Sequence, residues 1–311
     1  MKKTAGIHHI TAIVGHPQEN VDFYAGVLGL RMVKKTVNFD DPGTYHLYFG
    51  NEGGRPGTII TFFPWPDAYP GKIGDGQVGV TSYAVPLGAI SFWEKRLEKL
   101  QVPYTKSERF GESFLSLTDP HGLQLEIVER EAGEKNTWAF DGIHPDVAIK
   151  GVGGATLLSS RPKKTAELLE NIMGLEKVGE EGELIRFRSS ADIGNVIDLK
   201  STRSGPGRMG VGTVHHIAWR AADDADQLDW QKYVASHGYG VTPVQDRNYF
   251  NAIYFREHGN ILFEIATDPP GFAHDESLET MGEKLMLPQQ YEMYRQRLEE
   301  SLIPIKVREL N

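Results

Sequence analysis

Two pairs of adjacent histidines, His8-His9 and His215-His216, each stand near the start of a segment that alternates like a β-strand. A further candidate, Glu264, lies inside the otherwise apolar stretch Ile-Leu-Phe-Glu-Ile-Ala, where an unpaired charge would be costly to bury. Two imidazoles and one carboxylate can bind a divalent iron or manganese ion and leave open positions for a substrate and dioxygen. These residue types therefore predict a mononuclear metal site.

Strand geometry indicates which histidine of each pair is the better ligand, because adjacent strand residues point to opposite faces. His8 falls on the face of Ile10 and of the apolar residues that follow at every second position, which we expect to pack beneath a helix. His215 likewise falls with the apolar positions of its own segment. The second histidine of each pair, His9 and His216, is therefore predicted to bind the metal together with the glutamate.

Internal repeats indicate the elements that position these residues. Segments 21–33 and 165–178 both read as a helix that ends at Gly-Leu, so Gly29 and Gly174 are expected to adopt a left-handed conformation after the helix. Segments 119–127 and 256–265 both contain a His-Gly turn that leads into a strand with one glutamate. The chain therefore uses the same structural units more than once.

Strand-like starts, each followed by a helical stretch and β-rich sequence, predict an α+β fold of four βαβββ modules. The modules are placed at about 6–64, 76–130, 149–201 and 212–268. They are expected to form two pseudo-symmetric domains, residues 1–148 and 149–311. The tail contains a helix near 289–301 that would place Tyr291, Tyr294, Leu298 and Leu302 on one stripe, and we interpret it as a packing helix at an edge or in a homo-oligomer contact.

The modules also provide an internal comparison for the metal site. Glu126 stands in a phrase similar to that around Glu264, but segments 79–83 and 151–155 carry no histidine at the matching places. We therefore expect one pair of modules to hold a metal site and the other pair to have none. The remaining histidines lack a partner motif, and we predict no role in the site for any of them. They are His16, His46, His121, His144, His237, His258 and His274.

The composition limits the classes of function. The 311 residues carry a formal net charge of -9, which does not favour binding to nucleic acid or to an anionic membrane. The absence of cysteine excludes disulfides, thiolate nucleophiles and cysteine-based metal sites. The N-terminus lacks the apolar run of a signal peptide, and no stretch approaches the roughly 18 apolar residues of a membrane helix. We expect a cytoplasmic protein that acts on a small molecule.

At these residues the sequence resembles the vicinal oxygen chelate superfamily, and within it the dioxygenases of the methylhydroquinone type that cleave the ring of hydroquinones. The resemblance covers nearly the whole chain. Its distinctive passages are 6–11, 36–50, 58–66 and 214–219. It implies that the fold consists of vicinal oxygen chelate domains, and that the reaction is ring cleavage of a small aromatic substrate by O2 in the catabolism or detoxification of aromatic compounds.

The resemblance also implies roles for individual residues. The ligands of iron(II) in such enzymes match His9, His216 and Glu264, although manganese(II) is also compatible and other divalent metals could occupy the site after purification. Roles beside the metal or the substrate fall on other matched positions, namely His8, Thr11, His215, Arg247 and Tyr254.

Two other functions share this fold. A glyoxalase-type, metal-dependent isomerase or lyase normally recruits a fourth protein ligand, for which the sequence offers no convincing residue. A non-catalytic small-molecule binding protein would need no metal ligands, so the three candidates argue against it. A purely structural or interaction role has the least support.

Overall fold

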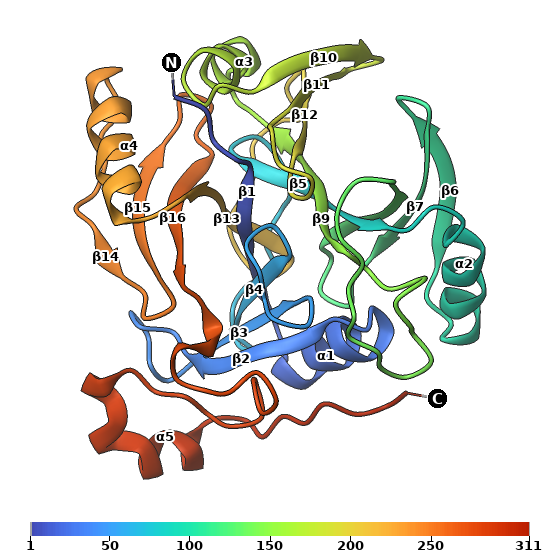
Figure 1. The fold of residues 1–311 in the computed structure, drawn as a ribbon, viewed down its shortest axis with the longest axis vertical. Coiled ribbons are helices and arrows are strands. Elements are labelled where there is room, and N and C mark those ends of the chain that lie inside the picture. Colours follow the sequence, from blue (N-terminus) through green and yellow to red (C-terminus); the bar gives the residue numbers. More distant parts are fainter. Residues whose placement is uncertain (1, 311) are drawn as a thin grey trace.

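The computed structural model describes residues 2–310 and consists of two curled sheets with few helices (Figure 1). The first repeat comprises β1 (Ile7–Val14), α1 (Pro17–Val21), the π-helix η1 (Asp22–Val27), β2 (Arg31–Val37), β3 (Tyr45–Gly50) and β4 (Ile59–Pro64). The second comprises β5 (Gln77–Val85), α2 (Ile90–Lys99), β6 (Tyr104–Arg109), β7 (Glu112–Thr118) and β8 (Gln124–Glu129). The third comprises β9 (Gly151–Leu158), α3 (Pro162–Asn171), β10 (Glu176–Glu181), β11 (Leu184–Arg188) and β12 (Val196–Lys200). The fourth comprises β13 (Thr213–Ala221), α4 (Asp224–Ser236), β14 (Gln245–Asp246), β15 (Phe250–Arg256) and β16 (Leu262–Pro270). The predicted α+β class with four βαβββ modules is confirmed.

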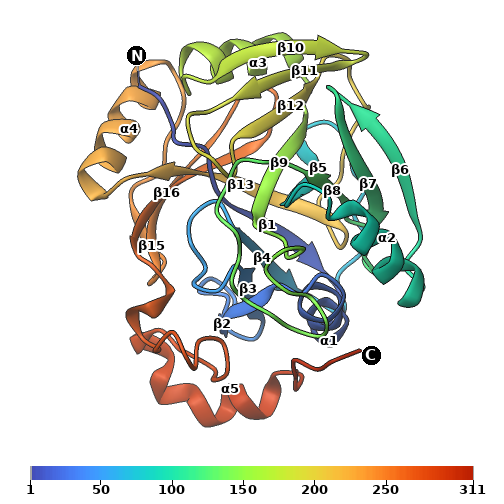
Figure 2. The same ribbon diagram turned by 45° about the vertical axis from the view of Figure 1, so that its right-hand side comes forward.

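The sheets combine modules that are distant in sequence. One sheet has the order β14-β15-β16-β13-β1-β4-β3-β2 and so joins the first module to the fourth. The other has the order β10-β11-β12-β9-β5-β8-β7-β6 and joins the third to the second. In the first sheet β1 and β13 are antiparallel neighbours near the centre of the molecule (Figure 2). The two His-His pairs therefore lie on adjacent strands, whereas the predicted boundary between residues 148 and 149 stays a prediction.

The helices end where the sequence repeats indicated. Gly29 has φ +66° and Gly174 has φ +73°, which confirms the left-handed conformation expected at both positions. A side chain at Gly29 would also collide with Ile143, because a Cβ there would lie 2.3 Å from the isoleucine Cδ1 atom. Glycine is therefore favoured at this turn by its conformation, and a larger residue would also force the Ile143 side chain to shift.

The apolar core consists of the residues between the sheets and their covering helices. Trp93 and Leu97 of α2, Leu168 of α3 and Trp230 of α4 are all buried in this core. A second, smaller apolar cluster, which includes Tyr48, Phe250 and Ala266, lies apart from it in the first sheet. Among residues 2–310, every helix is too short or too polar to cross a membrane.

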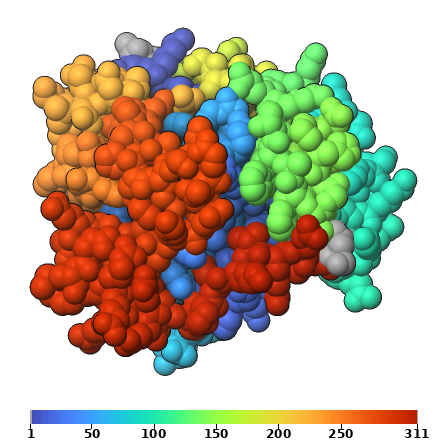
Figure 3. All heavy atoms as spheres, turned by 60° about the horizontal axis from the view of Figure 1, so that its bottom comes forward, coloured from blue at the N-terminus to red at the C-terminus, as the bar shows by residue number. Residues whose placement is uncertain are grey.

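The C-terminal segment covers the edge of the first sheet. After η2 (Phe272–His274), Met286 N donates to Lys35 O at 2.9 Å, so the chain shields edge strand β2. The segment continues through the 3₁₀ helix η3 (Gln289–Tyr294) and α5 (Arg295–Ser301), and it lies over the N-terminal part of the chain (Figure 3). Leu298 and Leu302 are buried, but Tyr294 is 47% exposed. The predicted stripe is wrong at Tyr294, because the first half of the segment is a 3₁₀ helix with a different spacing of side chains.

Candidate metal centre

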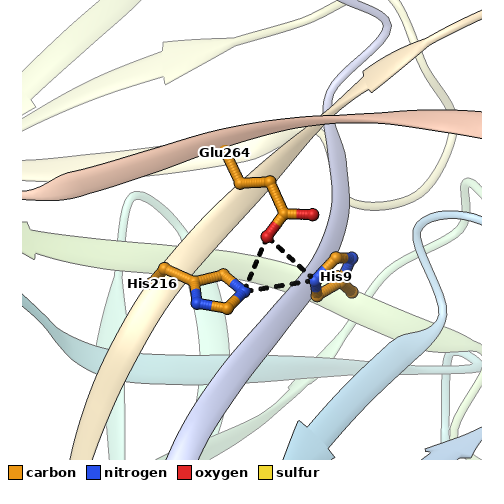
Figure 4. Close-up of side chains that lie close together, drawn as sticks. All are labelled: His9, His216 and Glu264. Atoms are coloured by element: carbon orange, nitrogen blue, oxygen red, sulfur yellow. Dashed lines mark hydrogen bonds and ion pairs between the residues drawn. The ribbon is translucent and has the colours of Figure 1, made fainter. Parts of the chain in front are cut away.

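Three adjacent strands bring the predicted ligands together. His9 lies on β1, His216 on β13 and Glu264 on β16, and their side chains point toward one another (Figure 4). The register places His9 opposite Ala218, and Ala218 opposite Glu264. Strand pairing alone therefore assembles a site from residues that are up to 255 positions apart in sequence, since 264 − 9 = 255.

The spacing of the three side chains fits a single metal ion. His9 Nε2 lies 3.3 Å from His216 Nε2, and Glu264 Oε2 lies 2.8 Å from His216 Nε2 and 3.6 Å from His9 Nε2. Two ligand atoms at about 2.1 Å from a common ion and at right angles to each other would lie about 3.0 Å apart. All three residues are buried. The donor set and its spacing are thus those of a site that could hold a divalent cation.

The electrostatics of the cluster also favour a cation. Burial acts to raise the pKa of Glu264, but the adjacent His9 and His216 hold that pKa well below its usual value. Burial lowers the pKa of His216. The ionised carboxylate of Glu264 is a buried negative charge, which a divalent ion held by the three side chains would compensate.

A β-bulge changes the orientation of the first histidine in each pair. His8 is an extra residue on β1, because Ile7 pairs with Trp219 while His9 pairs with Ala218. The extra residue interrupts the alternation of the strand. The ring of His8 consequently packs against His9 and Phe250 on the cavity side, with centroid distances of 5.1 and 5.3 Å. The expectation that His8 would lie beneath a helix is wrong.

The second pair has the same arrangement. His215 is an extra residue on β13, because Thr11 pairs with His216 while Ala12 pairs with Val214. Its ring lines the same cavity as His216, so the expectation that it would share the apolar face of its strand is also wrong. The bulges on the two neighbouring strands therefore place all four imidazoles on one side of the sheet.

His8 and His215, the first histidine of each pair, are called the outer histidines here, and each contacts the second histidine of its pair through the same ring nitrogen. The Nδ1 atoms of His8 and His9 are 2.9 Å apart, and those of His215 and His216 are 2.8 Å apart. Burial lowers the pKa of His8 and lowers the pKa of His215 to about 3, so both rings are neutral and can accept a hydrogen bond. When His9 and His216 donate from Nδ1, their Nε2 lone pairs remain free for a metal.

A cavity of about 560 Å³ opens above the three candidate ligands. Part of its wall is aromatic, and the residues that form this aromatic lining are Phe39, Tyr48, Phe63, Trp65, Phe250 and Tyr254. Polar and charged side chains line the rest, among them Asn38, Asp40, Gln245 and Arg247. A concave site that combines aromatic walls with polar groups suits a small aromatic molecule that carries oxygen substituents.

Arg247 and Tyr254 lie beside the cluster, as the family resemblance implied. Tyr254 pairs with Glu264 in the strand register, and its ring centroid lies 5.8 Å from that of His216. The guanidinium of Arg247 lies 5.7 Å from the centre of the Tyr254 ring and donates to Gln245 Oε1 at 2.6 Å. Burial and the charge of Glu264 raise the pKa of Tyr254, so its hydroxyl stays protonated and can donate.

The prediction that His46 has no place in the site is wrong. His46 lines the cavity, and its Nε2 atom lies 2.8 Å from Thr61 Oγ1. Thr61 in turn contacts Thr11, whose Oγ1 atom lies 2.8 Å away. His46 stands alone in sequence without a second histidine, so the pattern that identified the ligands could not find it. Its position two residues before Tyr48 in an alternating strand was the available signal.

The second sheet has an ion-pair network at the corresponding place. Glu126 accepts two hydrogen bonds from Arg109, at 3.0 and 2.8 Å, and one from Ser82 at 2.7 Å. Arg109 also lies 3.3 Å from Asp198. Within residues 2–310, the cluster of His9, His216 and Glu264 is the one group with metal-binding spacing. A fixed guanidinium thus balances the buried carboxylate here, and one pair of modules holds the candidate site.

The sequence of this chain matches a known protein family and several known proteins over most of its length. A model of the Glyoxalase/Bleomycin resistance protein/Dioxygenase superfamily matches residues 6–127 and 151–273. A Bacillus subtilis protein provisionally named ring-cleaving dioxygenase MhqO is 77% identical over 310 residues, covering 100% of this chain and 99% of that protein. A chlorohydroquinone/hydroquinone 1,2-dioxygenase of Sphingobium indicum is 36% identical, covering 96% of this chain and 95% of the relative.

Solved structures show the same fold. A crystal structure described as a provisional dioxygenase from Bacillus subtilis has a TM-score of 0.99 and 77% identity, and each chain is covered completely. Glyoxalase I from Zea mays has a TM-score of 0.63 at 11% identity, with 85% of this chain and 92% of that chain covered. The second likeness concerns the fold alone.

Proposed function

Because the chain belongs to the glyoxalase/bleomycin resistance protein/dioxygenase superfamily, we propose that it is an iron(II)-dependent dioxygenase that cleaves the ring of hydroquinone-type aromatics with O2. The observation that carries the proposal is the convergence of His9, His216 and Glu264 at an aromatic-lined cavity. The names of the relatives at 77% and 36% identity support the same reaction class. The two-histidine, one-carboxylate donor set is the one used by non-haem iron(II) oxygenases.

His9, His216 and Glu264 would hold the metal through two nitrogen atoms and one carboxylate oxygen. Bound there, iron(II) would supply Lewis acidity that favours a deprotonated substrate hydroxyl and the capacity to activate dioxygen. The burial of the three side chains keeps bulk water away from them. Their negative charge, from Glu264, would retain a divalent ion.

The cavity walls would bind and orient the aromatic ring. Phe63 and Phe250 offer apolar surface, and Tyr254 can donate a hydrogen bond to a substrate oxygen because its hydroxyl remains protonated. Arg247 holds the Tyr254 ring and adds a permanent positive charge close to a phenolate. Thr11, on the face of β1 that carries His9, is completely buried and contacts Thr61, so it would act on the site through its neighbours.

His8 and His215 would keep the ligand histidines in the metal-binding tautomer. Each would accept a hydrogen bond at Nδ1 and so fix both the ring orientation and the position of the proton in its neighbour. Because burial lowers the pKa of both rings, they would stay neutral near pH 7 and act as hydrogen-bond acceptors, and His215, which lines the cavity, would take up a proton only transiently during the reaction.

Oxygen uptake by the metal-loaded protein tests the proposal. The protein is purified without oxygen, loaded with iron(II) or manganese(II), and supplied with methylhydroquinone, catechol or the methylglyoxal-glutathione adduct. We expect oxygen consumption with methylhydroquinone, best with iron(II), and its loss in His9→Ala. His258→Ala, which removes an exposed histidine outside the cavity, is the matched control and should behave as the unmodified protein.

Two other outcomes would contradict the proposed dioxygenase activity. Turnover of the glutathione adduct without oxygen uptake would replace the dioxygenase with an isomerase of the same fold. Absence of bound metal at saturating concentrations would exclude both of these metal-dependent functions.

A further inference from the structure

The charged side chains around the cavity are mostly acidic. The carboxylates of Asp40, Asp41 and Glu264 line it, whereas Arg247 is the one permanent cation among the lining residues of the described chain, 2–310. Glu264 is completely buried beside the histidine ligands. The side chain of Asp40 is 77% exposed, so it lies where the cavity opens to solvent. Carboxylates therefore stand both at the candidate ligands and at the opening.

Asp40 and Gln245 engage the cation of the cavity. Arg247 Nη1 lies 3.2 Å from Asp40 Oδ2, and Arg247 Nη2 donates to Gln245 Oε1 at 2.6 Å. The side chain of Arg247 is only 19% exposed, so its charge is partly removed from solvent and is balanced by Asp40. An acidic group on a bound molecule would have to compete with Asp40 for this guanidinium.

Arg247 connects the opening of the cavity to the candidate ligands. Its guanidinium lies 5.7 Å from the centre of the Tyr254 ring, and that ring centroid lies 5.8 Å from the centroid of His216. All three side chains line the same cavity. A substituent on an aromatic ring bound at the ligands can therefore come within reach of Arg247.

The loop between β2 and β3 holds the two aspartates in place although both are exposed. Asp40 N donates to Asn38 Oδ1 at 2.9 Å, which forms a tight turn at the start of the loop. Asp41 Oδ2 accepts a hydrogen bond from Trp65 Nε1 at 2.8 Å. These contacts fix the carboxylates against the cavity wall, so the pairing of Asp40 with Arg247 is a property of the folded loop.

We propose that Asp40 is a specificity-determining residue that excludes aromatic diols with an acidic substituent and so restricts the substrate to uncharged hydroquinones. The proposal rests on the proposed function, which supplies the hydroquinone ring. An acidic substituent would meet carboxylates at the wall and would find the cation already paired. A phenolate oxygen is not excluded in this way, because a divalent ion held by the three ligands would compensate its charge.

Two ligands that differ in one charge provide the test. In 2,5-dihydroxyphenylacetate and 2,5-dihydroxyphenylacetamide, a carboxylate and an uncharged amide of similar size are attached to the same ring. Isothermal titration calorimetry of the manganese(II)-loaded protein without oxygen measures the affinity for each, because no turnover can occur. We expect the unmodified protein to bind the amide at least roughly tenfold more tightly than the carboxylate.

Asp40→Asn releases the guanidinium while it keeps the size of the side chain. We expect the preference for the amide to fall about tenfold, because the carboxylate ligand can now pair with Arg247. The double variant Asp40→Asn/Arg247→Met removes that partner and should regain the preference. Binding of the amide and circular dichroism report whether the cavity of each variant is intact.

Asp246→Asn is the matched control for the loss of a negative charge. The formal net charge of -9 disfavours the approach of any anion, so every aspartate contributes to this general effect. Asp246 is exposed and precedes Arg247 in sequence, but it does not line the cavity, and its side chain accepts a hydrogen bond from Asn248 N that asparagine can also accept. The preference for the amide should therefore stay close to that of the unmodified protein.

The outcomes separate the proposal from the proposed function. Equal affinity of the unmodified protein for the two ligands, or an unchanged preference in folded Asp40→Asn, would overturn the role of Asp40. An equal fall in preference in Asp246→Asn would overturn it as well, since the effect would then belong to the net charge. The expected preferences without oxygen uptake from methylhydroquinone would overturn the dioxygenase reaction and leave the selectivity of the cavity established. Absence of binding of either ligand would overturn both.

Discussion

Replacement of His215 by two different residues tests whether the outer histidines control the metal-binding tautomer. His215→Phe retains a ring but removes the acceptor that lies 2.8 Å from His216 Nδ1. His215→Asn instead places an amide oxygen at the same number of bonds from the backbone as Nδ1. Without an acceptor, His216 can move its proton to Nε2, which is the atom that must be unprotonated to bind a metal.

The magnitude follows from the contact that is removed. A hydrogen-bond partner that orients a metal-binding histidine typically contributes roughly 10- to 100-fold in metal affinity, which is about 1.4–2.8 kcal/mol. We therefore expect His215→Phe to bind iron(II) or manganese(II) 10- to 100-fold more weakly, and His215→Asn to remain close to the unmodified protein. Both variants keep His9, His216 and Glu264, so both should load fully at high metal concentration.

Competition with a chromophoric chelator under anaerobic conditions measures these affinities. Glu264→Ala, which removes a proposed ligand, provides the reference for complete loss of binding. Equal affinity of His215→Phe and the unmodified protein would refute the tautomer argument. Loss of metal from His215→Phe as complete as from Glu264→Ala would show instead that His215 is itself required to hold the ion.

Three further predictions concern stability and turnover. In the folded protein the pKa of His215 is lowered to about 3, below its value of ~6.5 in the unfolded chain, so the stabilisation by the neutral ring is fully present above pH ~6.5 and is lost as the pH falls towards 3. Denaturant unfolding of the metal-free protein should show a free energy of unfolding that falls by up to ~1.4 kcal/mol per pH unit in this range because of His215, and the fall should be smaller in His215→Asn. Arg109→Met leaves the buried Glu126 without its main partner and should lower the free energy of unfolding by about 3–5 kcal/mol, with unchanged metal content because the network lies in the other sheet; an unaffected unfolding midpoint would contradict the role assigned to this pair. Tyr254→Phe should reduce kcat/KM roughly 10- to 100-fold without loss of metal, as measured by oxygen uptake, and full activity would exclude the hydroxyl as a donor to substrate.

The amino-acid sequence by itself determined the fold class and the three candidate ligands. Local patterns indicate both the fold and the ligands. The repeated helix ends at Gly29 and Gly174 mark the modules. A carboxylate in an apolar strand, Glu264, indicates a buried charge that needs a partner. Strand alternation favoured His9 and His216 over their neighbours, although its premise that His8 and His215 face the other side of the sheet is wrong. These properties depend on residues close together in the chain, which a single sequence displays directly.

Only the tertiary structure decided which modules share a sheet and which way the other side chains face. The pairing of β1 with β13 creates a bulge in each strand, and each bulge turns the first histidine of its pair toward the cavity against the simple alternation. His46 joins the site for a similar reason, since its partner Thr61 comes from a neighbouring strand. Register and long-range pairing are set by the packing of whole sheets, so no pattern within one strand could reveal them.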